Sequence, residues 1–476
     1  MALRRPLCAA ASAAGRRQRR DAAQLGIRSL AAASRSYDVI IIGGGVIGNA
    51  CALELRKKGF TTLNVDMAPS PGYGSTSSSS AVIRHFYSLE DSCRMAWEGY
   101  HDWASWADYL QAPASEDLCE YREVGCALLD VPVSPGCQSF LRRVRNATDA
   151  CGIPVEEWDK AELKRRLPYL STASYFPPRR IDDEQFGEEN GSSIAGALFC
   201  AKSGYASDPQ LAARNLADAV LRHGGSFRWN ARVVSIDLDA TTTRVQGITL
   251  ADRSKIEAPI VVNAAGPHSA GMHSLAFQGA NVEDDACIHS QPLKVEVAYV
   301  REPPGSNLDE TCPVITDIDS GTYYRPQLGG QLLIGSIEPE CDELEFLSAP
   351  EELSGSLTDE WTNLVYRAAL RFPELAVPNT ATGLTALYDT TPDWVPIYDR
   401  SALGGFYSMR GTSGNQFKNA TVAGRICAAL VDGCENGYDH DSKPFSLKLD
   451  HVQGSLNLGL FSRLRSQQDT TNSVLG

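Results

Sequence analysis

The sequence lacks the features that mark several large classes of protein. No apolar run approaches the roughly 20 residues that a membrane-spanning helix needs. The 13 cysteines are odd in number and form no CxxC pair, which argues against a disulfide framework and against a zinc or iron–sulfur site. The eight histidines show no HExxH-like spacing. We therefore expect a reducing compartment, no transmembrane segment and no protein-bound metal.

Residues 1–36 contain no lysine and a single acid, Asp21, yet they carry eight arginines among many alanines and serines. A segment rich in arginine, alanine and serine and poor in acids is typical of an organelle transit peptide. We interpret it in this way and expect the mitochondrial matrix as the destination, although a plastid peptide has a similar composition. The alternative is a disordered basic arm that binds nucleic acid or a membrane surface.

From residue 37 onward the chain is strongly acidic. The first 36 residues hold seven net positive charges, so removing them changes the total of −14 to −21. This charge argues against nucleic acid and anionic membrane surfaces as partners, and any anionic substrate has to be captured by individually placed cations. The length of 476 residues and the hydrophobic content of 43% predict two domains or one large composite unit.

A strand, a glycine-rich turn and a helix follow one another in YDVIIIGGGVIGNACALELRKKGF, residues 37–60. The β-branched run at 39–42 suits a buried parallel strand. Gly43, Gly45 and Gly48 form the pattern G-x-G-x-x-G, in which the glycines permit a tight turn, the approach of backbone to a pyrophosphate, and close helix packing. This stretch predicts a dinucleotide-binding corner.

A second predicted strand, residues 61–65, ends at Asp66, whose carboxylate suits the hydroxyls of a ribose. The strand–helix–strand unit alone leaves NAD and FAD open. Two later segments favour FAD: IVVNAAGPHS at 260–269, a buried strand ending in small residues, and GTSGNQFKNA at 411–420, a glycine-rich turn before a helix. An extended FAD is the cofactor that three remote segments would all contact.

Eight motifs then occur in an order that characterises one family. They are IIIGGGVIG at 40–48, GSTSSSSAVIRHFY at 74–87, GYASDPQ at 204–210, NARVVSI at 230–236, VVNAAGPHS at 261–269, GTYYRPQ at 321–327, GLTALYDTTPD at 383–393 and GTSGNQFKNA at 411–420. On these motifs the chain resembles the FAD-dependent amino-acid oxidoreductases typified by D-amino-acid oxidase, glycine oxidase, sarcosine oxidase and dimethylglycine dehydrogenase. AVIRHFY and GTSGNQFK make the sarcosine and dimethylglycine branch the most similar.

The resemblance implies an α/β (α+β composite) fold with two parts. A Rossmann-like FAD-binding domain would be discontinuous, and a second domain, mostly an antiparallel β-sheet, would hold the substrate. The FAD-binding domain is expected at 37–120, 200–275 and 385–440, the substrate domain at 121–199 and 276–384, and a C-terminal tail at 441–476.

The resemblance also implies an activity. Such enzymes remove hydride from the carbon beside the amine nitrogen of a secondary or tertiary amino acid, and the resulting imine is hydrolysed. Arg84 and Lys418 match the cations that clamp the substrate carboxylate, a role that suits charge-assisted hydrogen bonds. Tyr388 and Tyr324, or its neighbour Tyr323, match positions over the flavin face. Arg325 is a third candidate cation.

The residues expected to bind FAD combine backbone atoms of the glycine-rich turns with short hydroxyl side chains and one acid. They are Gly43, Gly45, Val46, Ile47, Gly48, Asp66, Ser75, Thr76, Ser79, Ser80, Val233, Ala265, Gly266, Gly411, Ser413, Gly414 and Lys418.

The chain departs from the family pattern at three informative places. Ala386 replaces the cysteine that tethers the flavin in monomeric sarcosine oxidases, and the serine-rich loop shows no tethering histidine, so a non-covalent FAD is expected. Leu333 stands near the position of the lysine that activates oxygen in oxidases. We therefore expect a dehydrogenase that passes electrons to a flavoprotein or quinone carrier.

Two other readings remain open. Mitochondrial relatives of this fold also serve as assembly or accessory factors for respiratory complexes, in which the flavin would be structural. An NAD-only dehydrogenase would explain the first glycine-rich turn but would leave the later motifs unexplained.

Overall fold

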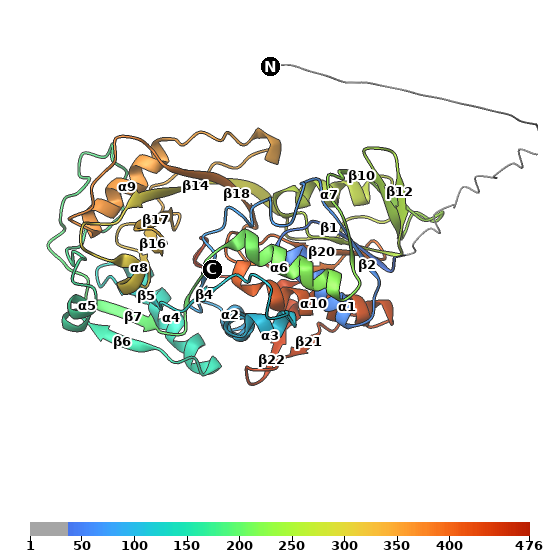
Figure 1. The fold of residues 1–476 in the computed structure, drawn as a ribbon, viewed down its shortest axis with the longest axis horizontal. Coiled ribbons are helices and arrows are strands. Elements are labelled where there is room, and N and C mark those ends of the chain that lie inside the picture. The colour runs from blue at the N-terminus through green and yellow to red at the C-terminus, as the bar shows by residue number, and fades with distance from the viewer. Residues whose placement is uncertain (1–36) are drawn as a thin grey trace, which may run out of the picture. The chain divides into compact units, whose positions relative to one another are not determined.

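The computed structural model describes residues 37–476, and the predicted transit peptide, residues 1–36, lies outside the described part. Residues 37–476 form one compact unit. Within it a six-stranded sheet, an eight-stranded sheet and three smaller sheets are joined by helices (Figure 1). Among residues 37–476 no helix combines the length and the hydropathy that crossing a bilayer would require.

The six-stranded sheet contains the predicted glycine-turn unit. All neighbouring strands run parallel except the pair at one edge, β19 and β20. In spatial order the strands are β19 (Ile397–Arg400), β20 (Phe406–Arg410), β13 (Ile260–Asn263), β1 (Val39–Ile42), β2 (Thr62–Val65) and β9 (Ser226–Arg228).

Strand β1 is buried on both faces because a different layer covers each face. Val39 and Ile41 pack into the core formed with the helices, whereas Ile40 and Ile42 pack toward a three-stranded sheet. That sheet consists of β10 (Val233–Leu238), β11 (Val245–Leu250) and β12 (Lys255–Glu257). This sandwich explains why the strand reads as a continuous β-branched run.

The eight-stranded sheet forms the second part of the fold. All of its neighbouring strands run antiparallel except the pair β15 and β5. In spatial order they are β18 (Gly383–Thr390), β14 (Gln291–Arg301), β17 (Gln331–Ser336), β16 (Thr322–Gln327), β15 (Val314–Asp317), β5 (Cys126–Asp130), β7 (Gly196–Cys200) and β6 (Glu156–Asp159). The predicted composite of a Rossmann-like part and a mostly antiparallel part is confirmed.

The helices cover the sheets, and four of them, α4, α5, α6 and α9, begin at a capping side chain. Asp208 caps one of them by accepting hydrogen bonds from the N–H groups of Gln210 and Leu211, both at 2.9 Å, and Pro209 follows it, which explains the motif ASDPQ. The helices are α1 (Val46–Lys57), α2 (Glu90–Ala104), α3 (Trp106–Leu110), α4 (Pro135–Cys151), α5 (Lys160–Arg166), α6 (Pro209–Arg222), α7 (Ser269–Phe277), α8 (Leu308–Thr311), α9 (Asp359–Arg371) and α10 (Ala420–Glu435).

Two smaller sheets and the final segment complete the described chain. One sheet contains β3 (Val82–Ile83), β8 (Gly204–Ala206) and β4 (Tyr121–Arg122), and the other contains β21 (Ser446–Lys448) and β22 (Ser455–Asn457). After a short 3-10 turn at Leu458–Phe461 the chain continues without helix or strand to Gly476. Strand β18 extends the eight-stranded sheet to Thr390, five residues beyond the expected start, at 385, of the last FAD-binding segment.

Candidate active site

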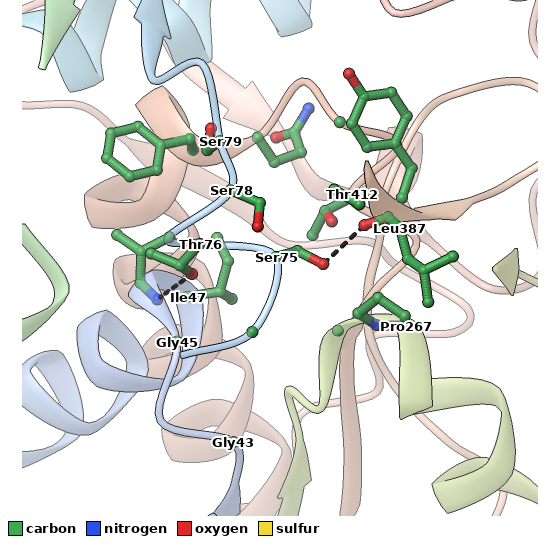
Figure 2. Close-up of a pocket in the computed structure, with 18 of the residues that line it drawn as sticks. Gly43, Gly45, Ile47, Ser75, Thr76, Ser78, Ser79, Pro267, Leu387 and Thr412 are labelled. Carbon is green, nitrogen blue, oxygen red and sulfur yellow. Dashed lines mark hydrogen bonds between the residues drawn. The ribbon is translucent and has the colours of Figure 1, made fainter. Parts of the chain in front are cut away.

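A cavity of about 540 Å³ runs from the glycine-rich turn after β1 to the eight-stranded sheet. Segments that are far apart in the sequence form its walls. They are the β1–α1 turn, the loop that follows β2, the strand ends around residues 231–233 and 264–268, strand β18, the turn 412–418 and residues 474–475. Figure 2 shows part of this cavity, with the serine-rich loop on one side and Leu387 and Thr412 on the other.

The glycine-rich turn has no room for side chains. A Cβ atom at Gly43, where φ is +123°, would lie 2.2 Å from the carbonyl oxygen of Ala264. At Gly45 a Cβ would lie 3.0 Å from Thr76 Oγ1, and at Gly48 it would lie 2.3 Å from the carbonyl oxygen of Gly43. Gly43 and Gly45 line the cavity, whereas Gly48 lies outside the lining and lets α1 approach the strand.

Asp66 holds this turn in shape. One carboxylate oxygen accepts a hydrogen bond from the N–H of Gly44 at 2.6 Å, and the other accepts one from the N–H of Ala68 at 2.7 Å. Asp66 still lines the cavity together with Ala231 and Val233. The predicted ribose-binding acid is therefore also part of the scaffold of the turn.

The serine-rich loop closes over the N-terminus of α1. Thr76 Oγ1 accepts a hydrogen bond from the N–H of Val46 at 3.1 Å, and Ser75 Oγ donates one to the carbonyl oxygen of Leu387 at 2.7 Å (Figure 2). Ser80 Oγ and Tyr323 Oη lie 2.5 Å apart. Val46, Ile47, Ser75, Thr76, Ser79 and Ser80 all line the cavity, and so does Ser78, which sequence analysis missed.

Arg84 and Lys418 both line the cavity, and both contact Tyr87. The Lys418 ammonium donates hydrogen bonds to Tyr87 Oη at 3.0 Å and to the carbonyl oxygen of Asn415 at 2.7 Å. The Arg84 guanidinium carbon lies 4.5 Å from the centre of the Tyr87 ring. The structure thus brings together two buried cations from segments more than 300 residues apart, as the resemblance implied.

Burial shifts the pKa values of the ionisable side chains that line this part of the cavity. The pKa of Lys418 is lowered well below its ordinary range, first by burial and second by the positive charge of Arg84. Burial raises the pKa of Tyr323 to about 12 and raises the pKa of Tyr388 as well. Both phenols are therefore neutral hydrogen-bonding groups at physiological pH.

Strand β16 presents Tyr323 to the cavity, and this corrects the prediction of Tyr324. Successive side chains of a strand point to opposite faces. Tyr323 lines the cavity, whereas the Tyr324 hydroxyl lies on the other face in a buried network with Ser320 at 3.0 Å and Thr322 at 2.6 Å. Arg325 is also buried and lies outside the lining, with its guanidinium carbon 4.4 Å from the centre of the Tyr205 ring.

The glycine-rich turn before α10 meets the cavity through Gly414 and Lys418. A Cβ atom at Gly414, where φ is +67°, would lie 2.4 Å from the ring of Tyr388, so the turn lies directly against that ring. Gly411 and Ser413 lie behind the lining, against Asp389: the Gly411 N–H donates to the Asp389 carboxylate at 2.6 Å and the Ser413 N–H to its carbonyl oxygen at 2.8 Å.

The lining residues fit an extended dinucleotide, which the glycine-rich turn after β1 would hold at its pyrophosphate. The N–H groups in the first turn of α1 suit a pyrophosphate, because they have no partner within the helix. Ala265 and Gly266 line the middle of the cavity. Asp66 is the only acid among the lining residues of the described chain, so no carboxylate side chain of the lining competes for Arg84 and Lys418.

Other residues of the site could not be recognised from sequence patterns. Val474 and Leu475 line the cavity next to Arg84, although they belong to the tail at 441–476, for which no ligand-binding role was predicted. Tyr87 ends the motif AVIRHFY, but its position between two cations depends on where Lys418 lies. Leu333 and Ala386 are buried, and only Ala386 lines the cavity.

Comparison with known proteins identifies what this arrangement resembles. A family model described as FAD dependent oxidoreductase matches residues 38–430. N-methyl-L-tryptophan oxidase of Yersinia pestis (strain Pestoides F) is 25% identical over 203 residues, which are 42% of this chain. The matched region spans 47% of that relative, so the chain covers about half the length of the curated relatives it matches.

Solved structures show the same fold at low sequence identity. L-proline dehydrogenase from P. horikoshii superposes with a TM-score of 0.67 at 19% identity, covering 83% of this chain and 93% of that one. Glycine oxidase from Geobacillus kaustophilus gives a TM-score of 0.65 at 21% identity, covering 88% and 100%. Iminodiacetate oxidase from Chelativorans sp. BNC1 gives 0.63 at 18% identity, covering 85% and 98%.

Proposed function

The chain belongs to the FAD dependent oxidoreductase family, and from this premise we propose that it removes hydride from the carbon beside the amine nitrogen of an N-substituted amino acid. Loss of the hydride, with its two electrons, leaves a C=N bond, which water hydrolyses to an amine and a carbonyl compound. When bound, FAD supplies the acceptor for the hydride. The protein binds and orients the substrate.

One observation carries this proposal: Arg84 and Lys418 both line the cavity and converge on Tyr87. Two buried cations with no lining acid beside them form a receptor for a carboxylate, and charge-assisted hydrogen bonds are strong in such a site. Tyr87 holds the Lys418 ammonium at 3.0 Å and lies beneath the Arg84 guanidinium. A carboxylate held there would be fixed at the wall formed by Tyr323 and Tyr388.

Neighbouring walls favour a substrate whose N-substituents and side chain are uncharged. The eight-stranded sheet contributes Val297, Val314 and Thr316 to the lining. These side chains suit a small apolar N-substituent or side chain, such as those of N-methylglycine and N,N-dimethylglycine, and they offer no partner for a second ammonium group. The similar proteins, which are named for N-methyl-L-tryptophan, L-proline, glycine and iminodiacetate, agree with an amine that bears a carboxylate.

Two features support a non-covalent FAD and transfer of electrons to a carrier. Ala386 lines the cavity where a tethering cysteine would be expected. Leu333 is 2% exposed and packs in the core of the eight-stranded sheet, so it contributes no cation to the cavity. A dehydrogenase with a flavoprotein or quinone acceptor is consistent with both features.

The test is an anaerobic titration of the flavin-loaded protein. N-methylglycine, N,N-dimethylglycine, glycine and proline would be added in turn, and we expect at least one to bleach the absorbance of oxidised flavin. Slow recovery on admission of air would support a dehydrogenase, and rapid recovery would indicate an oxidase. Arg84→Met should weaken the apparent affinity for the amine that reduces the flavin at least tenfold, since a charge-assisted bond is lost. The exposed control Arg165→Met should leave this affinity unchanged. A bound flavin that no amine reduces would contradict the proposal and favour an accessory flavoprotein.

A further inference from the structure

We propose that residues 473–475 form a displaceable wall of the substrate end, and that their backbone competes with a substrate carboxylate for the Arg84 guanidinium. The inference rests on the proposed function because it assumes that Arg84 binds carboxylates. It goes further by adding a segment of the C-terminal tail to the substrate site and by making its displacement a condition of tight binding.

The Arg84 guanidinium is engaged by carbonyl groups. Its Nη2 group donates hydrogen bonds to the carbonyl oxygens of Val474 at 2.6 Å and Leu475 at 3.0 Å, and its Nη1 group donates to that of Phe86. Both Val474 and Leu475 line the cavity. A carbonyl is neutral, whereas a carboxylate adds a full charge and a fork geometry that matches guanidinium. The segment thus fills the position that a carboxylate would bind more strongly.

Besides the two bonds from Arg84, three hydrogen bonds hold residues 473–476 to more distant parts of the chain. The Val474 N–H donates to the Glu338 carboxylate at 2.8 Å, and both Ser88 Oγ and the Ser88 N–H donate to the main-chain oxygen of Gly476, at 2.9 Å and 3.5 Å. Ser473 is 4% exposed, and Leu475 is 6% exposed and packs in the core of the eight-stranded sheet. No helix or strand includes residues 471–476, so displacement would break no ladder of backbone hydrogen bonds.

The chain just before the segment is held far more firmly. The Arg465 guanidinium donates to the Asp393 carboxylate at 2.9 Å and 3.0 Å and to the carbonyl oxygen of Val395 at 2.7 Å. Thr470 Oγ1 donates to the carbonyl oxygen of Asp393 at 2.8 Å. Movement of the segment is therefore expected to begin after Thr470, because the residues up to Thr470 are held more firmly than those that follow.

A competing segment lowers apparent affinity in a defined way. If only a fraction of the molecules present a free Arg84, the apparent dissociation constant rises in inverse proportion to that fraction. Removing the competitor should therefore tighten the binding of a carboxylate, in contrast to the usual effect of removing a wall of a binding site, which is to weaken it. The sign of the change distinguishes the two roles.

The experiment measures propionate binding to the flavin-loaded protein by the shift of flavin absorbance and by isothermal calorimetry. Deletion of residues 473–476 should tighten propionate binding about tenfold or more. Glu338→Ala removes the acceptor of the Val474 N–H and should tighten binding in the same direction. The matched control Glu340→Ala alters an exposed glutamate two residues away and should have no effect.

Glu338 is an acid near Arg84, so Glu338→Ala changes the charge beside Arg84 as well as the hydrogen bond to the segment. A double-mutant cycle separates these two effects on propionate binding. In the deletion background Glu338→Ala should cause no further change if it acts through the segment. Weaker or unchanged propionate binding after the deletion would overturn the proposal. If the deletion variant does not fold, two other measurements test the proposal. Glu338→Ala must tighten propionate binding, and propionate must speed the hydrogen exchange of the Val474 and Leu475 backbone amides. Because propionate is not oxidised, these results do not depend on whether any amine reduces the flavin.

Discussion

Lys418 shows, at the scale of one residue, how a binding role conflicts with stability. Its ammonium is buried, it has no carboxylate partner among the described residues, and its pKa is lowered by that burial. A charge in such a place costs free energy unless a ligand of opposite charge is present. The residue is therefore expected to weaken the empty protein and to stabilise the complex.

Lys418→Met should raise the free energy of unfolding by roughly 1 kcal/mol or more, because replacing a buried ion by an apolar side chain is often stabilising. The Asn415 carbonyl would keep its hydrogen bond from Tyr87 Oη at 2.9 Å, so no buried acceptor is left unpaired. The same variant should weaken propionate binding at least tenfold. Urea denaturation and calorimetry measure the two effects, with exposed Lys202→Met as the control. A less stable Lys418→Met variant would show that the hydrogen bonds of the lysine outweigh its burial.

At the scale of single elements, helix α9 is attached to the eight-stranded sheet by a buried ionic cluster. The Arg371 guanidinium lies 2.8 Å from the carboxylates of both Asp317 and Asp319, and all three residues are at most 1% exposed. It also donates to the carbonyl oxygens of Ser171 at 2.7 Å and Ala173 at 2.9 Å. One guanidinium thus ties the helix end to a strand end and to a loop.

Arg371→Met should lower the free energy of unfolding by about 3–5 kcal/mol, since it leaves two buried carboxylates without a cation beside them. The control Arg165→Met removes a solvent-exposed ion pair on α5 and should leave the denaturation midpoint unchanged. Thermal and urea denaturation provide the measurement. A small loss on Arg371→Met would mean that the carboxylates take up protons or water in its absence.

Elements also show what the sequence can and cannot predict. The turn 43–48 was recognisable because its glycines, strand and helix are contiguous, and Arg84 and Lys418 because each sits in a distinctive motif. Tyr323 and Tyr324 are adjacent, and only the pairing of β16 with its neighbours decides which one faces the cavity. Val474 and Leu475 follow no periodic pattern, so nothing local indicates that they lie beside Arg84.

At the scale of the whole molecule, buried neutral histidines set the response to acid. His85 is fully buried, and its Nε2–H donates a hydrogen bond to the carbonyl oxygen of Lys202 at 2.8 Å. Burial lowers its pKa to about 4, with Lys418 adding to the effect. The unfolded chain then binds more protons than the folded one between pH 6.5 and 4, so stability falls as the pH falls through this window.

His85 alone should cost up to roughly 3 kcal/mol of unfolding free energy between pH 7 and pH 4. Urea denaturation across that range measures the loss. In His85→Phe the slope of stability against pH should be shallower, whatever the stability of the variant at pH 7. An unchanged slope would show that other groups dominate the acid response.

The subcellular localisation of the protein is a separate prediction at this scale. We propose that residues 1–36 direct the protein to mitochondria, on the basis of their arginines and the near absence of acids. Fused to a fluorescent reporter, this segment should bring it to mitochondria, and replacing its eight arginines by glutamine should abolish the import. Nuclear or plastid accumulation of the fusion would contradict the expectation.

Trp229, on the loop after β9, gives the molecule an optical reporter of its own. The indole lies directly over the glycine-rich turn: a Cβ atom at Gly44 would fall 2.4 Å and 2.7 Å from two carbons of its six-membered ring. Flavins absorb in the range where tryptophan emits, so cofactor bound in the adjoining cavity should quench this fluorescence by energy transfer. The difference in emission between the natural protein and a Trp229→Phe variant would then follow cofactor loading in real time, without a label and without turnover.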